Sequence, residues 1–140
     1  KEVEDSYVRG IECIVRTQHR SGGWGQQHDN ETFQPCSARS YEGPWLATKE
    51  SGTICEMLDR HLSYVPYLLA EEVDTAIDRC RFWLIMTRLP NGSWPRFVFP
   101  GTTTAVFSDR EGNIYKTWEE LPDERRYGYG WFLSSPWNAL

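Results

Sequence analysis

The chain has 140 residues, of which 39% are hydrophobic and 25% are charged, and its net charge is −5. This length suits a single domain with its own hydrophobic core. The negative charge and a pI near 5.2 argue against a nucleic-acid partner, because no basic stripe is present to release counterions from phosphates. No apolar run approaches the roughly 20 residues that span a bilayer, so no transmembrane segment is expected.

The first helix is predicted at residues 3–19. Apolar side chains recur there at helical spacing, and charged side chains occupy the opposite face. Acidic residues in the first turn and basic residues near the end suit the helix dipole, and Gly22 and Gly23 end the helix. The apolar stripe consists of Val3, Tyr7, Ile11, Ile14 and Val15.

Residues 26–43 are polar and contain Pro35, so this segment is predicted to be a loop of ordered turns. A second helix is predicted at residues 45–63, because Pro44 suits a first helical turn and Pro66 ends or interrupts the helix. Its inner face carries Ala47, Ile54, Leu58 and Leu62.

The third predicted helix, residues 71–89, is apolar almost all round. One stripe consists of Phe82, Ile85, Met86 and Leu89, and a second consists of Ile77, Cys80, Trp83 and Leu84. Such a helix is expected to be buried on more than one side. Pro90, Asn91 and Gly92 end it, and Trp94 follows the turn.

The pattern then changes to short β-prone runs at residues 96–99, 105–107 and 114–118. Residues 109–113, between the last two runs, are rich in turn-forming types. Together they predict a β-hairpin within residues 97–118. We expect this hairpin to be an insertion into a helical scaffold.

The first and third predicted helices carry the same pattern at a constant sequence offset, which we call the repeat offset. It superposes Arg9 on Arg79, Ile14 on Leu84, Thr17 on Thr87, Gly22 on Gly92 and Trp24 on Trp94. A second match, of residues 44–47 with residues 136–139, has a larger offset, because the second copy contains extra residues. A repeat of this length indicates a repeat architecture, with one unit at residues 1–70 and the other at residues 71–140.

The repeated pattern resembles the QW motif of squalene and hopene cyclases and of the related prenyltransferases. That motif combines a basic, a small, an aromatic and an aliphatic residue with a glutamine and a Gly-x-Trp turn. The first copy has Cys13 in place of the aromatic residue, and the second has Arg88 in place of the glutamine. The resemblance implies an all-α fold of (α/α) toroid repeats in an incomplete ring, with the hairpin as a small insertion.

In that family the glutamine and the tryptophan are structural. The glutamine bonds to the start of a neighbouring helix, where backbone groups lack partners, and the indole stacks over it. The resemblance implies that both turn tryptophans are buried in matching positions. It implies structural roles for Gln18, Gly22, Trp24, Trp83, Gly92 and Trp94.

The catalytic signatures of those enzymes are missing from the sequence. No DxDD motif is present to protonate an alkene, and the nearest acidic cluster, residues 71–74, suits the start of a helix. His19, His28 and His61 have no cysteine or second histidine at the spacing of a zinc site. We therefore expect no catalytic residue, no metal and no cofactor. The four cysteines, none in a CxxC pair, are expected to be reduced, as in a cytoplasmic protein.

A second resemblance concerns residues 91–95, whose sequence NGSWP is similar to the Asn-Gly-Gly-Trp-Pro turn of certain pectate lyases. Trp137, Asn138 and Ala139 are similar to the Asn-Asp-x-Ala helix start of the same enzymes, although the aspartate is missing. Those enzymes bind calcium through carboxylates and use an arginine as the base. The resemblance implies a polysaccharide lyase on a toroid, but the sequence has no dense carboxylate cluster.

Two regions could bind a ligand. His28 and Asp29 follow the first Trp turn and could accept a cation or a polar ligand, although a solvated loop explains them more simply. Aromatic rings near the end of the chain could line the apolar mouth of a toroid and stabilise a carbocation, or could pack the hairpin against the scaffold. These rings belong to Tyr127, Tyr129, Trp131 and Trp137.

Three functions fit these observations. The first is a non-catalytic toroid-repeat module that binds a protein partner or an apolar small molecule within a larger protein. The second is a fragment of a terpene cyclase whose acid motif lies outside this sequence, and the third is a toroid polysaccharide lyase. Because stacked repeats need neighbours on both sides, the rest of a longer parent chain or a protein partner is expected to cover the apolar third helix.

Overall fold

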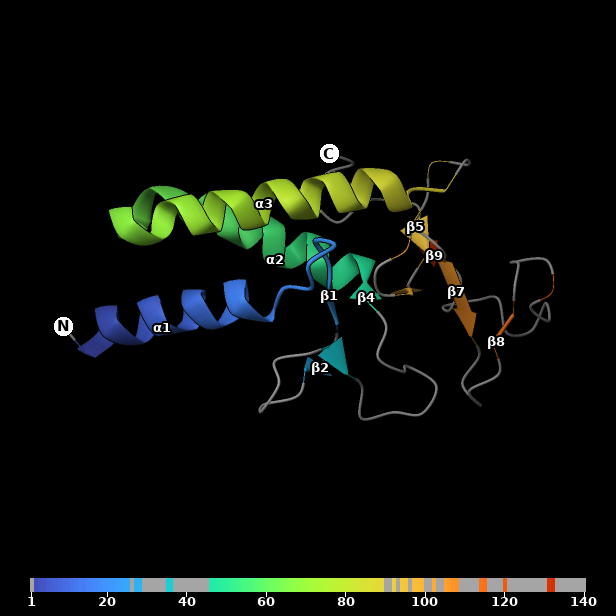
Figure 1. Cartoon of the computed structure of the whole chain (residues 1–140), viewed down its shortest axis with the longest axis horizontal. Coiled ribbons are helices and arrows are strands. Elements are labelled where there is room, and N and C mark those ends of the chain that lie inside the picture. Colours follow the sequence, from blue (N-terminus) through green and yellow to red (C-terminus); the bar gives the residue numbers. More distant parts are fainter. Residues whose placement is uncertain are drawn as a thin grey trace.

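The computed structural model describes residues 2–25, 27–28, 35–36, 46–89, 92, 94–95, 97–99, 102, 105–108, 114–115, 120 and 131–132. For residues 27–28, 35–36, 105–108, 114–115 and 131–132 the description covers the backbone. Helices account for most of the regular structure, and short strands gather where α1 and α3 end and α2 begins (Figure 1). None of the helices in this part of the chain is long and apolar enough to cross a membrane.

Three α-helices are present in this part of the chain: α1 (Glu2–Thr17), α2 (Thr48–His61) and α3 (Tyr67–Thr87), with the 3₁₀ turn η1 (Leu62–Tyr64) between the last two. The three predicted helices are thus confirmed, with shifted starts. Helix α2 begins three residues later than predicted, because Leu46 and Ala47 belong to a strand. Helix α3 begins four residues earlier, directly after Pro66, whose carbonyl accepts hydrogen bonds from the backbone N–H groups of Leu69 and Ala70.

The strands that the structure describes form a five-stranded antiparallel sheet in the order β1-β4-β6-β7-β8 and two further strand pairs, β2–β3 and β5–β9. The sheet strands are β1 (Trp24–Gly25), β4 (Leu46–Ala47), β6 (Phe97–Val98), β7 (Ala105–Ser108) and β8 (Ile114–Tyr115). The paired strands are β2 (Gln27–His28), β3 (Pro35–Cys36), β5 (Trp94–Pro95) and β9 (Trp131–Phe132). Strand β4 from the first half of the chain pairs with β6 from the second half, so the sheet joins the two halves.

The predicted hairpin is confirmed, but it is not an insertion found only in the second half. Strands β7 and β8 pair within residues 97–118. The pair β6–β7, in contrast, corresponds to the pair β2–β3 in the first half of the chain. In β2–β3 Gln27 lies opposite Cys36, and at the repeat offset Phe97 lies opposite Val106. The segment predicted as a loop therefore contains a strand pair, whose two-residue strands are too short for sequence alternation to reveal.

The fold is therefore mostly helical with a small antiparallel sheet, which confirms the predicted class only in part. The ring arrangement of toroid repeats and the division into units at residue 70 stay predictions. The second match of residues 44–47 with 136–139 falls partly outside the described residues. By strand register, β9 of the second half corresponds to β4 of the first half. Trp24 of β1 lies opposite Ala47 of β4, and Trp94 of β5 likewise lies opposite Phe132 of β9.

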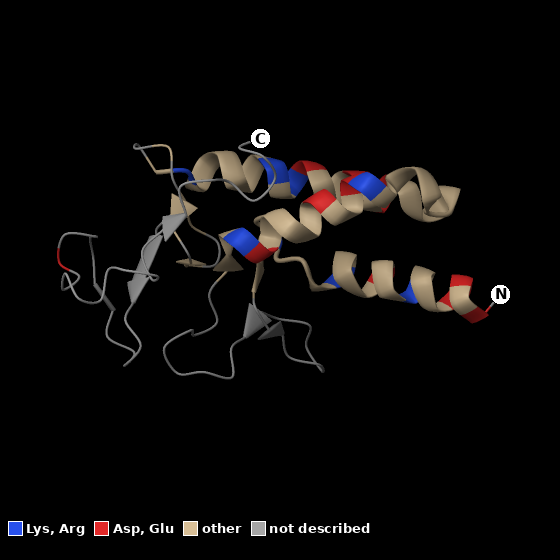
Figure 2. Cartoon of the chain, turned by 180° about the vertical axis from the view of Figure 1, so that it is seen from behind, with Lys and Arg blue, Asp and Glu red and all other residues tan. Residues whose placement is uncertain are grey.

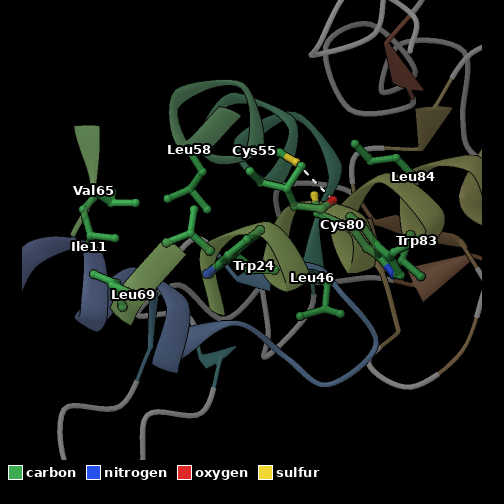
Figure 3. Packing of buried hydrophobic residues seen from close by; sticks show 14 of the residues in the cluster. Ile11, Trp24, Leu46, Cys55, Leu58, Val65, Leu69, Cys80, Trp83 and Leu84 are labelled. Carbon is green, nitrogen blue, oxygen red and sulfur yellow. Dashed lines mark hydrogen bonds between the residues drawn. The ribbon is translucent and has the colours of Figure 1, made fainter. Parts of the chain in front are cut away.

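One hydrophobic cluster lies between the three helices and the strands. Its members come from α1, α2, α3 and the turns, and include Ile11, Leu58, Leu69 and Leu84 (Figure 3). The buried thiol of Cys55 on α2 donates a weak hydrogen bond to the carbonyl of Ile77 on α3, with sulfur and oxygen 3.6 Å apart. The contact between α2 and α3 is thus the centre of the core.

The outer face of α3 is exposed, contrary to the prediction that this helix is buried on more than one side. The exposed fractions are 63% for Phe82, 54% for Ile85 and 50% for Met86. Only the second apolar stripe of α3, which holds Ile77 and Leu84, is buried in the described structure. Elsewhere on the helices acidic and basic residues are mixed, with acidic residues at the N-terminal end of α1 (Figure 2).

Candidate functional site

The two Gly-x-Trp turns each lead into a short strand, β1 or β5, and the tryptophan of each turn makes an equivalent hydrogen bond. The indole Nε1–H of Trp24 donates to the carbonyl oxygen of Ile14 at 2.9 Å, and that of Trp94 donates to Leu84 at 2.8 Å. Each acceptor lies ten residues before its tryptophan. Trp24 is 3% exposed and Trp94 is fully buried. The predicted burial of both tryptophans in matching positions is confirmed.

The glycines of the two turns also match. Gly22 has a φ of +117° and Gly92 a φ of +86°, a region that side-chain-bearing residues seldom adopt. The N–H of Gly22 donates to the carbonyl of His19 at 2.8 Å, and the N–H of Gly92 donates to that of Leu89 at 2.9 Å. Both turns thus close the preceding helix in the same way.

The residue that corresponds to the glutamine of the QW motif behaves differently in the two turns. Gln18 Nε2 donates to the carbonyl of Gly22 and to the carbonyl of Ala76, both at 2.9 Å. Arg88 keeps the first bond, since its Nε–H donates to Gly92 at 2.9 Å, and its guanidinium lies 4.6 Å from the centre of the Trp94 ring. The expected bond to the start of a neighbouring helix is wrong, because Ala76 lies in the middle of α3.

The first turn of α2 ties the two Gly-x-Trp turns together. Ser51 Oγ accepts a hydrogen bond from the backbone N–H of Trp24 at 2.8 Å, and Thr48 Oγ1 donates to the carbonyl of Pro95 at 2.6 Å. Both side chains are fully buried. Neither residue was predicted from the sequence, although hydroxyl side chains three residues apart lie on one face of a helix. We call the two turns and this first turn of α2 the turn face.

Trp83 on α3 packs against the first turn. A Cβ atom added to Gly23 would lie 2.8 Å from Cη2 of Trp83, and one added to Gly22 would overlap the carbonyl oxygen of Arg79. Close packing therefore requires glycine at both positions. Among the described residues the indole nitrogen of Trp83 has no hydrogen-bond partner, although it is buried, so this ring contributes through its contact area.

Two groups near the turn face have shifted pKa values. Burial, and to a lesser extent the charge of Arg20, lowers the pKa of His19 below its usual 6.5. The Nδ1 atom of His19 lies 2.7 Å from Ser21 Oγ and accepts a hydrogen bond from the backbone N–H of Ser21 at 3.1 Å. The hydrogen bond with Cys55, together with burial, raises the pKa of Cys80. The Cys80 thiol is thus protonated and unreactive.

Comparison with known families decides between the two resemblances. The family model for pectic acid lyase matches residues 1–93 and 69–138. The chain belongs to the pectic acid lyase family. No curated protein sequence matches. The resemblance to squalene and hopene cyclases and to prenyltransferases is therefore wrong: a helix followed by a Gly-x-Trp turn is not specific to those enzymes, whereas NGSWP at residues 91–95 pointed to the lyases.

Family membership does not test the predicted ligand-binding residues, which stay predictions. His28 lies in β2 and its backbone pairs with Pro35, while Trp131 lies in β9 and its backbone pairs with Pro95. Asp29, Tyr127, Tyr129 and Trp137 lie outside the described residues. The structural roles of the turn residues are likewise predictions, which alanine substitution of the turn glycines can test.

Calcium is the metal that the lyase resemblance implies. Among the described residues no group of three or more histidine, cysteine or carboxylate side chains could hold a metal ion. Two of the described acids form ion pairs with basic residues of their own helix instead, Glu12 with Arg16 and Glu56 with Arg60, with oxygen–nitrogen distances of 3.7 and 2.7 Å. The described part of the chain therefore does not fit a calcium site, and we derive no catalytic step from calcium.

Proposed function

We propose that this chain acts as a polysaccharide lyase on pectic acid. The observation that supports the proposal is the match to the pectic acid lyase family over residues 1–93 and 69–138. In a β-elimination, a base removes the proton at C5 of a uronate, the C4–O bond breaks, and the leaving sugar oxygen takes a proton. The products are a shortened polymer and a chain end with a C4–C5 double bond. This proposal replaces the hypothesis of a non-catalytic, cyclase-like module.

We place the polymer at the turn face, where α2 begins. The N-terminal end of a helix attracts anions, because its first N–H groups point outward and carry partial positive charge. Lys49 is exposed in the first turn of α2, directly beside the buried Thr48. The same first turn also carries the acid Glu50, so Lys49 must outweigh this charge for a uronate carboxylate to bind beside the two Gly-x-Trp turns.

The charge of the chain bears on how it would bind a polyanion. With a net charge of −5, the protein repels pectic acid at long range, and this repulsion is weaker at higher salt. Local cations such as Lys49 must therefore compensate at the site. Binding through one or two cations predicts a modest salt dependence.

The proposal can be tested by incubating the purified chain with polygalacturonate and following the ultraviolet absorbance of the unsaturated product. The assay is run with added calcium, with a chelator, and with a neutral polysaccharide as the control. We expect the absorbance to rise with polygalacturonate and to stay constant with the neutral polysaccharide. Binding without an absorbance change under any condition would identify a pectic acid-binding module in place of a lyase. If the chain neither binds nor cleaves polygalacturonate, both functions are refuted.

The position of the polymer can be tested with Lys49→Gln. This change removes one cation from the start of α2, and we expect KM for polygalacturonate to rise several-fold while kcat changes little. The matched control is Arg60→Gln, which removes the same charge from the last turn of α2, at the opposite end of the helix. An equal effect of both variants would mean that only overall charge matters and that the turn face is not the binding site.

The cytoplasmic location expected from the cysteines stays a prediction, which cell fractionation can test.

A further inference from the structure

Two cysteines meet at the centre of the core, one on α2 and one on α3. Cys55 and Cys80 are both fully buried, and Figure 3 shows their sulfur atoms between the two helices. The thiol of Cys55 donates to the carbonyl oxygen of Ile77 on α3 at 3.6 Å. The thiol of Cys80 donates to the carbonyl oxygen of Ser51 on α2 at 3.5 Å. Each thiol thus reaches the backbone of the opposite helix.

These reciprocal contacts require a close approach of the two helix backbones. A cysteine side chain is short, so its sulfur atom reaches a facing carbonyl only where the helices lie near each other. Small buried residues surround the contact: Ser51 and Gly52 on α2 and Ala76 on α3. A disulfide needs such an approach, because its two Cα atoms must lie within about 7 Å and its Cβ atoms must point toward each other.

The two sulfur atoms also interact directly. The hydrogen bond with Cys55 is the largest of the effects that raise the pKa of the Cys80 thiol. A hydrogen bond between two thiols places their sulfur atoms side by side before any covalent bond exists. Because a disulfide bond is about 2 Å long, its formation requires the sulfur atoms to move toward each other along this existing contact.

Loss of the thiol protons leaves no carbonyl of this contact without a partner. Ser51 lies within α2 and Ile77 lies within α3. Their carbonyl oxygens therefore also accept the N–H of the residue four positions later in the same helix. The bonds from the thiols are weak additions, so a disulfide avoids the penalty of an unsatisfied buried group.

We propose that Cys55 and Cys80 form a disulfide that fastens α2 to α3 where the surrounding thiol pool is oxidising. The oxidant is a small disulfide such as oxidised glutathione. One cysteine thiolate attacks a sulfur of the small disulfide and expels a small thiolate, and the other cysteine then attacks the mixed disulfide and expels the second. The two cysteine protons pass to the released thiolates, so the products are one protein disulfide and two small thiols. Where the pool is reducing, the pair stays as two thiols.

Burial determines when this exchange takes place. Both sulfur atoms are covered in the folded chain, so a small disulfide reaches them only during folding or when α2 separates from α3. Cys13 is exposed and should react with thiol reagents first. The disulfide fixes the helix whose first turn belongs to the turn face, but the proposal does not depend on lyase activity.

The test is to equilibrate the whole chain in buffers with graded ratios of oxidised to reduced glutathione and to map its disulfides by mass spectrometry. We expect the pair Cys55–Cys80 to exceed every other pairing of the four cysteines at least tenfold. The control is the same series in concentrated urea, where this preference should disappear because the helices no longer hold the two sulfur atoms together.

Thermal melts test whether the disulfide fastens the helices. The oxidised chain should melt about 10 °C above the reduced chain, because the crosslink restricts the unfolded chain. Cys80→Ala should abolish this difference, whereas the matched control Cys13→Ser, at the exposed cysteine of α1, should keep it. Mapping of the unmodified chain tests the proposal even where Cys80→Ala does not fold. The proposal is overturned if another pairing predominates in the folded chain, if Cys55 and Cys80 stay reduced at every ratio, or if the oxidised chain does not melt higher.

Discussion

At the scale of single residues, three glycines differ in backbone conformation and in the room that a side chain would have. Among the described residues, no atom lies within 4 Å of a Cβ added to Gly10, and a Cβ added to Gly92, which has a positive φ, has room beside Arg88. Gly22 also has a positive φ, but a Cβ there would overlap the backbone of Arg79. The repeat pattern predicted that Gly22 and Gly92 are equivalent. It could not distinguish their surroundings, because the carbonyl that blocks Gly22 belongs to Arg79, far along the chain.

Alanine substitution at these glycines should therefore give three different changes in the free energy of unfolding. Gly10→Ala should stabilise the chain by about 1 kcal/mol, as for a helix interior. Gly92→Ala should cost about 1–2 kcal/mol for left-handed backbone. Gly22→Ala adds a clash, which costs roughly a further 1–3 kcal/mol. Chemical denaturation measures all three, and equal costs at Gly22 and Gly92 would show that α3 does not pack on the first turn.

The histidine beside the first turn should make stability depend on pH. His19 has a lowered pKa in the folded chain, so its neutral form is favoured there, with Nδ1 accepting the N–H of Ser21. Its contribution is complete above the unfolded pKa of about 6.5 and is lost as pH falls through the folded value. Thermal melts between pH 8 and pH 5 should show a decline that is smaller in His19→Asn. An identical decline in both proteins would assign it to other groups.

At the scale of elements, periodicity and hydrogen-bond reach explain what the sequence could predict. The helices of 14 to 21 residues show several turns of apolar spacing, so all three were predicted within a few residues. Strands of two residues, such as β2 and β3, show no alternation, and one strand pair was predicted as a loop. Ser51 and Thr48 bond to residues 27 and 47 positions away, which no local pattern reveals.

The first turn of α2 should consequently be sensitive to loss of its hydroxyl groups. Ser51→Ala removes the acceptor of the buried Trp24 N–H, and an unsatisfied buried donor costs about 1–3 kcal/mol. Thr48→Val removes a donor to the Pro95 carbonyl and should cost about 1 kcal/mol. Thr53→Val is the control, because Thr53 is exposed and bonds within its own helix. Urea denaturation that ranks Thr53→Val as most damaging would contradict this role of the turn.

At the scale of the whole molecule, the sequence predicted the match between the two Gly-x-Trp turns correctly and the family wrongly, for one physical reason. The hydrogen bonds of the two Gly-x-Trp turns involve residues within ten positions, so a short pattern captures them. The cyclase and lyase families both use such a turn, and the pattern alone therefore fits both. The candidate site depends on how the turns meet α2 and on the strand register, which pair residues from different halves of the chain.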